Sequence, residues 1–217
     1  MIGPLSPFVP WPAGERLVLA SRSPRRAELL QVAGIPFTVA YPGDVEERHA
    51  PRLQADAAHP GAYAQALASA KATDVAAAMP KQLVLGADTI VVLDGDILEK
   101  PVDEEEAFSL LSRLAGRRHT VITGLALVDG LAAAAERPLV GHESTEVEFL
   151  PLEPRQIRDY IATGEPMDKA GAYGIQGYGA LMVAGVSGCY FNVMGLPLAR
   201  LGAMLRRALA GRGNERG

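Results

Sequence analysis

The chain has 217 residues, of which 48% are apolar and 21% are charged, a balance typical of a globular protein with a substantial core. The formal net charge of −4 argues against a protein that grips nucleic-acid backbones broadly, because that function requires a basic surface. Cys189 is the single cysteine, which excludes an intramolecular disulfide and favours a reducing compartment.

The N-terminus lacks a basic start followed by an apolar run, and no apolar stretch is long enough to span a bilayer. We therefore expect a cytoplasmic protein with no membrane partner and no nucleic-acid polymer as partner. Residues 1–15 are rich in proline and are expected to form a poorly ordered tail or to cover a neighbouring surface through Phe8 and Trp11. We expect a single domain over 16–210 and a C-terminal tail over 211–217.

Short apolar strands alternate with helices in the first half of the chain. Ser23 is typical of an N-cap and Pro24 of a first helical residue, whereas Asp94-Gly95 is typical of a tight hairpin turn. Apolar periodicity and Gly or Pro boundaries predict strands at 17–20, 35–40 and 83–93, and helices at 24–34, 62–78 and 103–116.

The second half of the chain continues the alternation but adds a second Asp-Gly turn. The pattern predicts strands at 120–128, 141–149, 181–186 and 190–193, a glycine-rich loop at 171–179, and helices at 154–164 and 197–209. Two hairpins interrupt a purely parallel order. We therefore expect an α/β fold with a mixed, largely twisted central sheet flanked by helices.

Two arginines, Arg25 and Arg26, fall in the first turn of the helix that follows the first strand. Cations at this position oppose the helix dipole and do not favour stability. The free N–H groups of the helix, both guanidinium groups and Ser23 would instead form a phosphate cradle. The alternative is that both arginines point to water or pair with Glu28 or other nearby acids. Two arginines directly after Ser-Pro at such a turn favour anion binding.

Asp88 ends an apolar strand, where a carboxylate is costly unless it binds something. A metal ion, or a water molecule awaiting deprotonation, would meet this need. An aspartate that accepts hydrogen bonds from the backbone of a turn fits the same segment equally well.

Gln176 lies inside the glycine-rich loop, where small residues let the backbone approach a flat ligand closely. Its amide both donates and accepts, which suits the edge of a nucleobase. Isolated glycines by themselves favour an ordinary surface loop.

Other polar residues give weaker signals. The acidic segment 44–47, which includes Glu47, could supply a metal-binding carboxylate but is more often a solvated turn, and Lys71 on the Ala-rich helix is more often solvated than a phosphate ligand. The four histidines lack metal-ligand spacing and are expected to be structural. No Walker A, G-x-G-x-x-G or G-x-S-x-G sequence supports an ATP-loop, dinucleotide or serine-hydrolase interpretation.

Six segments form an ordered set: Leu17–Arg26, Asp44–Glu47, Gly86–Thr89, Glu99–Pro101, Asp168–Gly177 and Asn192–Pro197. In this order and spacing, they resemble the Maf family over roughly residues 16–209. The resemblance implies a nucleotide pyrophosphatase with two lobes around a cleft, a divalent metal (Mg²⁺ or Mn²⁺) and a homodimer. Arg22 departs from the pattern, because the family usually has a small residue there.

One arm of the family acts on dTTP and UTP, and another acts on 7-methyl-GTP. The sequence is similar to the first arm, because Thr89 follows Asp88 and Gln176 stands in the loop, where the other arm is expected to have Gln and Glu. A neutral amide matches the alternating donors and acceptors of uracil or thymine, whereas a carboxylate suits the cationic 7-methylguanine ring.

The resemblance also implies roles for individual residues. Asp88 would accept a proton from the water that attacks the α-phosphorus and, with Glu47, would hold the metal, while Arg25 and Arg26 would bind the phosphates. Lys71 and Lys100 would add positive charge as pyrophosphate leaves and the nucleoside monophosphate forms. The alternative is a nucleotide-binding regulator without turnover, because the family is also associated with inhibition of septum formation.

Overall fold

The structure is a computed structural model that describes residues 6–45, 48, 59–130 and 138–214. The chain divides into two compact units, and each unit is discontinuous in sequence. Unit 1 comprises Met1–Asp88, Thr123–Glu143 and Gly195–Gly217, and unit 2 comprises Thr89–Ile122 and Ser144–Met194.

The described residues form one mixed sheet with the strand order β2-β1-β3-β5-β6-β7, in which β4 pairs with β3. The predicted α/β class and mixed sheet are therefore confirmed. The strands are β1 (Leu17–Ala20), β2 (Phe37–Ala40), β3 (Leu83–Leu93), β4 (Asp96–Leu98), β5 (Arg118–Asp129), β6 (Leu139–Phe149) and β7 (Val183–Ser187). The α-helices are α1 (Pro24–Val32), α3 (Pro60–Ala78), α4 (Glu104–Leu114), α5 (Pro154–Ile161), α6 (Tyr190–Val193) and α7 (Leu198–Asn214).

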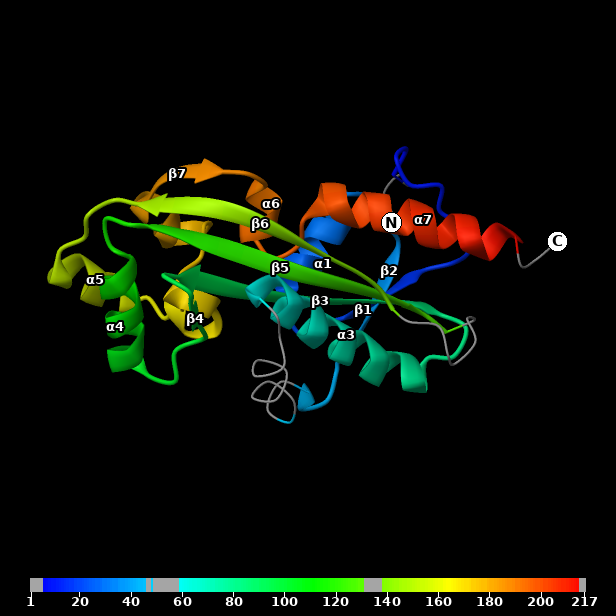
Figure 1. Cartoon of the computed structure of the whole chain (residues 1–217), viewed down its shortest axis with the longest axis horizontal. Coiled ribbons are helices and arrows are strands. Elements are labelled where there is room, and N and C mark those ends of the chain that lie inside the picture. The colour runs from blue at the N-terminus through cyan, green and yellow to red at the C-terminus, as the bar shows by residue number, and fades with distance from the viewer. Residues whose placement is uncertain (1–5, 46–47, 49–58, 131–137, 215–217) are drawn as a thin grey trace. The chain divides into compact units, whose positions relative to one another are not determined.

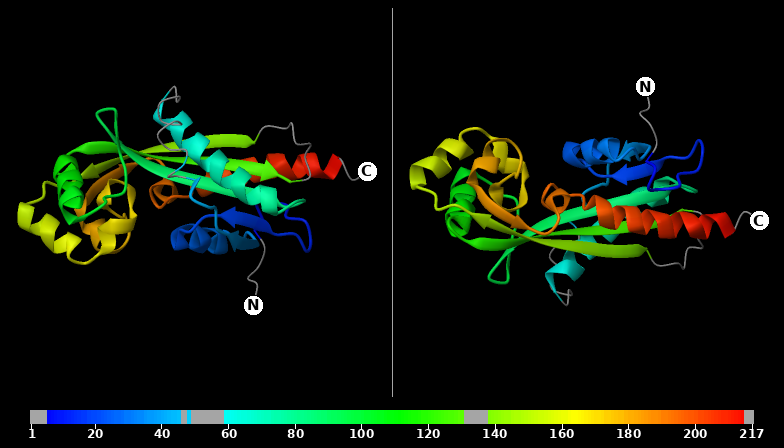
Figure 2. Two further views of the ribbon diagram at one scale, coloured as in Figure 1. Left: turned by 90° about the horizontal axis from the view of Figure 1, so that it is seen from below. Right: turned by 90° about the horizontal axis from the view of Figure 1, so that it is seen from above.

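In unit 1, β1 pairs in parallel with β2 on one side and with β3 on the other. The crossover through α1 runs from β1 to β2, and the crossover through α3 runs back from β2 to β3. Right-handed crossovers that run in opposite directions along a sheet place their helices on opposite faces. Figure 1 shows α1 and α7 on one face and α3 on the other, and the two views of Figure 2 show α3 and α7 crossing the strands from opposite sides.

The alanine bias of α3 has a structural cause. A Cβ atom at Gly86 would strike the Ala68 carbonyl, and one at Gly124 would strike the backbone of Ala64. Alanines on the buried side of α3 and glycines on the strands below therefore let helix and sheet approach closely. A small buried cluster forms between them, made of Val18, Ala20, Ala68, Ala72, Val75, Val84 and Ala126.

The described part of the N-terminal segment packs against unit 1. The Ser6 backbone N–H donates to the Gly34 carbonyl at 2.8 Å, and Arg206 of α7 donates to the Phe8 carbonyl at 3.2 Å. Val9 is the buried apolar residue of this segment, whereas the Phe8 side chain is 76% exposed. Of the two arrangements expected for residues 1–15, residues 6–15 adopt the one that covers a surface, but Phe8 does not serve as an anchor.

Unit 2 has a core of its own, built mainly from apolar faces of α4 and α5 against strand residues. Asp103 caps α4 by accepting from the Glu106 N–H at 2.8 Å, and Glu106 accepts from the Val102 N–H at 2.7 Å, as the acidic start of this helix predicts. The buried members on the helices are Ala107, Leu110, Leu111, Leu114, Ile157, Tyr160 and Ile161.

His119 is part of this core. Its ring meets Phe149 and Tyr173 edge to face, with ring centroids 4.9 and 5.3 Å apart, and its Nε2 lies 2.8 Å from the Tyr173 hydroxyl. Burial lowers the pKa of His119 to about 4, because the desolvated imidazole resists taking a charge. Its contacts are structural, as expected from the scattered histidines.

Most predicted elements are present, and one is wrong. Residues 190–193 were expected to form a strand but form the short helix α6. The Asn192 side chain is fully buried and donates to the Val121 carbonyl at 2.9 Å and to Thr145 Oγ1 at 3.0 Å, contacts that a period-2 pattern does not reveal. Within the described part of the chain, no helix is both long and apolar enough to cross a membrane.

Candidate active site

The strand order of unit 1 predicts where a ligand binds. β1 and β3 are parallel neighbours, with Ala20 opposite Gly86, and the chain leaves β1 towards β2 on the far side before returning to β3. In open α/β sheets, ligands bind beyond the carboxyl ends of the strands where the order reverses in this way. The segment after Ala20 carries the predicted cradle. The prediction that Asp88 ends a strand is wrong, because Asp88 lies inside β3, which continues to Leu93.

Asp88 and Lys71 form a buried ion pair at this position. Lys71 Nζ lies 2.5 Å from Asp88 Oδ1, and the two side chains are only 8% and 10% exposed. Lys71 belongs to the helix face that rests on Gly86, so the close approach of α3 brings the ammonium to the carboxylate. The interpretation of Lys71 as a solvated helix residue is wrong.

Burying two charges is favourable only when each has a well-placed partner, because desolvation offsets most of the Coulombic gain. Such a pair is costly to maintain for stability alone. A buried charged pair beside the carboxyl end of β1 is therefore a strong candidate for a catalytic site.

Arg26 is buried and bonded within unit 1. Its Nε donates to the Gly195 carbonyl at 2.9 Å, and its Nη1 donates to Ser21 Oγ at 3.1 Å. The Ser23 backbone N–H also donates to Ser21 Oγ, at 3.1 Å. Arg26 thus ties the start of α1 to the chain just before α7, whereas the sequence predicted it as a phosphate ligand beside Arg25. Ser21 and Gly195 were not predicted as partners, although both lie inside the segments that carry the family resemblance.

Arg25 and Ser23 complete the start of α1. Arg25 is half-buried, and α1 has no acidic residue in its first turn. Ser23 occupies the N-cap position, but its side chain makes no capping hydrogen bond. The positive end of α1 therefore lacks an acidic residue of its own, which suits an anionic ligand.

Three predicted site residues belong to unit 2. Thr89 follows Asp88 along β3 and is half-buried, whereas Lys100 and Gln176 are both exposed. The Gly171 N–H donates to the Glu99 carbonyl at 3.1 Å, which joins the glycine-rich loop to the residue before Lys100. The structure thus places Lys100 and the loop of Gln176 in one compact unit.

Glu47 lies outside the described residues. Among 6–45, 48, 59–130 and 138–214, no three His, Cys, Asp or Glu side chains gather in a way that could hold a metal ion. Asp88 Oδ1 is in contact with the Lys71 ammonium, so the described donors do not by themselves fit a divalent cation.

Unit 1 also has a groove of about 490 Å³ that is separate from the predicted site residues. It runs between the start of β6 and α7, where Arg200 donates to Glu143 at 3.1 Å. None of the predicted site residues lines it. Its lining consists of Leu139, Val140, Gly141, Glu143, Arg200, Ala203, Met204 and Arg207.

The fold and site define an α/β protein with a buried Lys–Asp pair just beyond the carboxyl end of β1, where Asp88 lies inside the neighbouring parallel strand β3. The family model described as "Maf-like protein" matches residues 16–208. The chain belongs to the Maf family, as its motifs indicated.

Curated relatives match nearly the whole chain. The "dTTP/UTP pyrophosphatase" of Symbiobacterium thermophilum is 53% identical over 88% of this chain and 93% of its own length. The protein of the same description from Moorella thermoacetica is 51% identical over the same shares. A solved nucleoside-triphosphatase (dITP/XTP pyrophosphatase) from Mycobacterium abscessus covers 90% of this chain and 96% of its own, at 16% identity and a TM-score of 0.41.

Proposed function

We propose that the chain is a nucleoside triphosphate pyrophosphatase that hydrolyses dTTP, UTP and related non-standard pyrimidine nucleotides to the monophosphate and pyrophosphate. The observation that carries this proposal is the buried Lys71–Asp88 pair on β3, beside the carboxyl end of β1. The descriptions of relatives at 53% and 51% identity support the reaction and the pyrimidine preference.

Asp88 is the proposed general base. Lys71 contacts Oδ1, so we assign proton acceptance to Oδ2. The oxygen of the attacking water bonds to the α-phosphorus, and the bond from that phosphorus to the α–β bridging oxygen breaks. The bridging oxygen leaves with pyrophosphate, and the nucleoside monophosphate is the other product.

Cations and helix N–H groups are proposed to stabilise the negative charge that grows on the phosphate oxygens. Arg25 and the start of α1 would bind the triphosphate, while Arg26 holds that start in place through Gly195 and Ser21. Lys100 is assigned to a phosphate oxygen, and Thr89 and Gln176 are assigned to the base.

Other expectations from the family resemblance stay proposals. The divalent metal, Mg²⁺ or Mn²⁺, would take Glu47 and Asp88 as ligands, but the described donors alone do not form its site, so we assign it no step. A homodimer and a cytoplasmic location are likewise predictions. Light scattering after size-exclusion chromatography tests the dimer.

The decisive experiment measures pyrophosphate release from a panel of UTP, dTTP, CTP, ATP, GTP and 7-methyl-GTP. It is run with Mn²⁺, with Mg²⁺ and with a chelator. We expect pyrophosphate and monophosphate in equal amounts, fastest from UTP and dTTP. Nucleotide binding without turnover would support a regulator instead, and release of orthophosphate would contradict attack at the α-phosphorus.

A further inference from the structure

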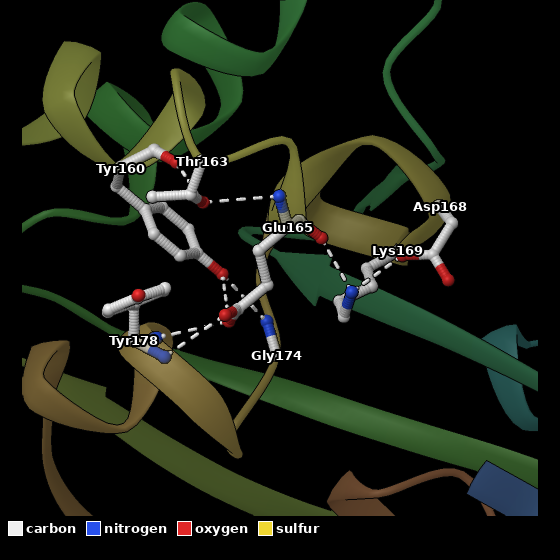
Figure 3. Close-up of polar contacts among 8 residues, drawn as sticks. Tyr160, Thr163, Glu165, Asp168, Lys169, Gly174 and Tyr178 are labelled. Atoms are coloured by element: carbon white, nitrogen blue, oxygen red, sulfur yellow. Dashed lines mark hydrogen bonds and ion pairs between the residues drawn. The ribbon is translucent and has the colours of Figure 1, made fainter.

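The Glu165 carboxylate lies at the centre of a hydrogen-bond network in unit 2. Its Oε2 accepts from the Tyr178 N–H at 3.0 Å, and its Oε1 accepts from the Gly179 N–H at 3.1 Å. Figure 3 shows the carboxylate directed at these backbone N–H groups. A carboxylate that accepts hydrogen bonds from backbone donors fixes the segment that carries them, because charge-assisted hydrogen bonds are among the stronger ones.

Tyr160 extends the network to the other side of the loop. Its hydroxyl donates to Glu165 Oε1 at 2.9 Å and accepts from the Gly174 N–H at 3.2 Å (Figure 3). Burial raises the pKa of Tyr160 above its usual range, so the phenol keeps its proton and stays a donor at physiological pH. Glu165 and Tyr160 together therefore hold Gly174 and residues 178–179, which flank Gln176 on both sides.

The loop is shaped to fit this pair of side chains. Gly177 has φ +69°, and a Cβ atom there would strike the Glu165 carboxylate. A Cβ atom at Gly179 would strike the Gly174 carbonyl and come within 2.8 Å of the Tyr160 hydroxyl oxygen. The glycines thus admit Glu165 and Tyr160 into the loop, which accounts for part of the glycine content of this segment.

The two side chains are themselves firmly held. Tyr160 lies on the buried face of α5 within the unit 2 core. The Glu165 N–H donates to Thr163 Oγ1 at 3.2 Å, and Lys169 Nζ donates to the Glu165 carbonyl at 2.5 Å. Gln176 itself is exposed, and among the described residues no partner hydrogen-bonds its side-chain amide. Its position therefore depends on the backbone that Glu165 and Tyr160 hold.

We propose that Glu165 and Tyr160 are positioning residues that set the base selectivity of the enzyme by holding the loop of Gln176. This inference rests on the proposed function, in which Gln176 contacts the base. Neither side chain touches the reacting phosphate in this scheme. A misplacement of about 1 Å in a group that orients substrate is enough to change rates substantially.

The test compares kcat and KM for UTP and GTP in the wild type, Glu165→Gln, Tyr160→Phe, Gln176→Ala and the double variant Glu165→Gln/Gln176→Ala. Glu165→Gln removes one of the two acceptor oxygens, and Tyr160→Phe removes a single hydroxyl. We expect Glu165→Gln to lower the UTP:GTP ratio of kcat/KM about tenfold, mostly through KM, and Tyr160→Phe to lower it less. In the Gln176→Ala background, the Glu165 substitution should cause no further change in the ratio.

Glu105→Gln is the matched control, because it makes the same chemical change in the same unit. Glu105 accepts from Arg158 at 3.1 Å and is 74% exposed, so its variant should keep the wild-type ratio. Hydrogen exchange of the Tyr178 and Gly179 amides gives a second readout, which should speed up in Glu165→Gln and stay unchanged in Glu105→Gln.

The possible outcomes separate the two claims. If Gln176→Ala leaves the ratio unchanged, the assignment of Gln176 to the base in the proposed function fails. If Gln176→Ala changes the ratio but Glu165→Gln and Tyr160→Phe scale both substrates equally, the positioning role is overturned and the network is only structural. Tyr160→Phe keeps the buried ring, so it decides the question even where Glu165→Gln folds poorly.

Discussion

Asp88 carries the chemistry at the scale of single residues. Asp88→Asn keeps the shape of the side chain but removes the base, so turnover should fall at least about a hundredfold. Pyrophosphate release by the purified variant, with folding checked by circular dichroism, measures the effect. Asp96→Asn is the control, because Asp96 is 68% exposed and pairs with Arg113 at the surface. Near-normal turnover in Asp88→Asn would rule out the general base.

Alanine substitutions at the neighbouring residues Arg25 and Arg26 should affect different properties: catalysis for Arg25 and the free energy of unfolding for Arg26. Arg25→Ala should impair catalysis while changing the free energy of unfolding by less than about 0.5 kcal/mol, because a cation leaves a helix N-terminus. Arg26→Ala removes the donor that the buried Gly195 carbonyl accepts from and one of the two donors to Ser21 Oγ, which should cost roughly 1–3 kcal/mol. Urea denaturation and pyrophosphate release measure the two effects. A strongly destabilised Arg25→Ala would show that Arg25 is structural.

Gln176 tests the choice of base. Gln176→Glu replaces a donor with a negative charge near a carbonyl oxygen of uracil or thymine. The cost should be roughly 1–3 kcal/mol, or about tenfold to a hundredfold in specificity. The same carboxylate should improve acceptance of the cationic 7-methyl-GTP, while Thr89 still favours the pyrimidine. The ratio of kcat/KM for UTP and 7-methyl-GTP should therefore shift without fully inverting, and an unchanged ratio would remove the support for the pyrimidine assignment.

At the scale of secondary-structure elements, the packing of α3 against β3 determines the distance between Lys71 and Asp88. Gly86→Ala would place a Cβ atom against the Ala68 carbonyl, and the helix would have to move away from β3. Overpacking of this kind should cost at least roughly 1–3 kcal/mol and should also separate Lys71 from Asp88, so stability and turnover fall together. Gly185→Ala is the control, because nothing lies within 4 Å of its added Cβ atom. Urea denaturation and pyrophosphate release of both variants test this, and a fully stable, active Gly86→Ala would contradict it.

Local patterns predicted most elements, but tertiary contacts decided the exceptions. Cap residues and apolar periodicity located α1, α4 and the strand β3, because those signals are local. Residues 190–193 have high strand propensity, yet the buried amide of Asn192 bonds to Val121 and Thr145 and the segment is helical. Strand propensity largely reflects packing context, so it fails where a buried side-chain contact is made with a distant part of the chain.

The sequence predicted part of the candidate site, just as it predicted most but not all of the elements. The sequence singled out Asp88, which interrupts an apolar strand, and the arginines of α1, because charged side chains at these positions are costly without a ligand. The side chains that contact these residues could not be predicted from the sequence. The pairing of Lys71 with Asp88 depends on the glycine that admits α3, and the role of Glu165 depends on a loop conformation that glycines alone do not specify.

The spacing of the motifs did not predict how the chain divides into two compact units. Each unit is assembled from segments far apart in the chain, and β3, β5 and β6 each contain residues of both units. The segments that resemble the Maf family are accordingly shared between the units, with Asp88 in unit 1 and Gln176 in unit 2. The family match over 16–208 therefore includes residues of both compact units.

The stability of the whole molecule should depend on pH through His119. Its pKa is about 4 in the folded protein against 6.5 when unperturbed, so below pH 6.5 the unfolded chain takes a proton that the folded core refuses. The contribution of the neutral His119 to the free energy of unfolding is fully present above pH 6.5 and is lost as the pH falls to 4. The loss amounts to about 3 kcal/mol. Urea denaturation between pH 4 and 7 should show a shallower dependence for His119→Gln than for the wild type. Tyr173→Phe should keep the wild-type slope, because desolvation rather than the hydrogen bond to Tyr173 lowers the pKa. Equal slopes in the wild type and His119→Gln would show that the imidazole is not the group that titrates.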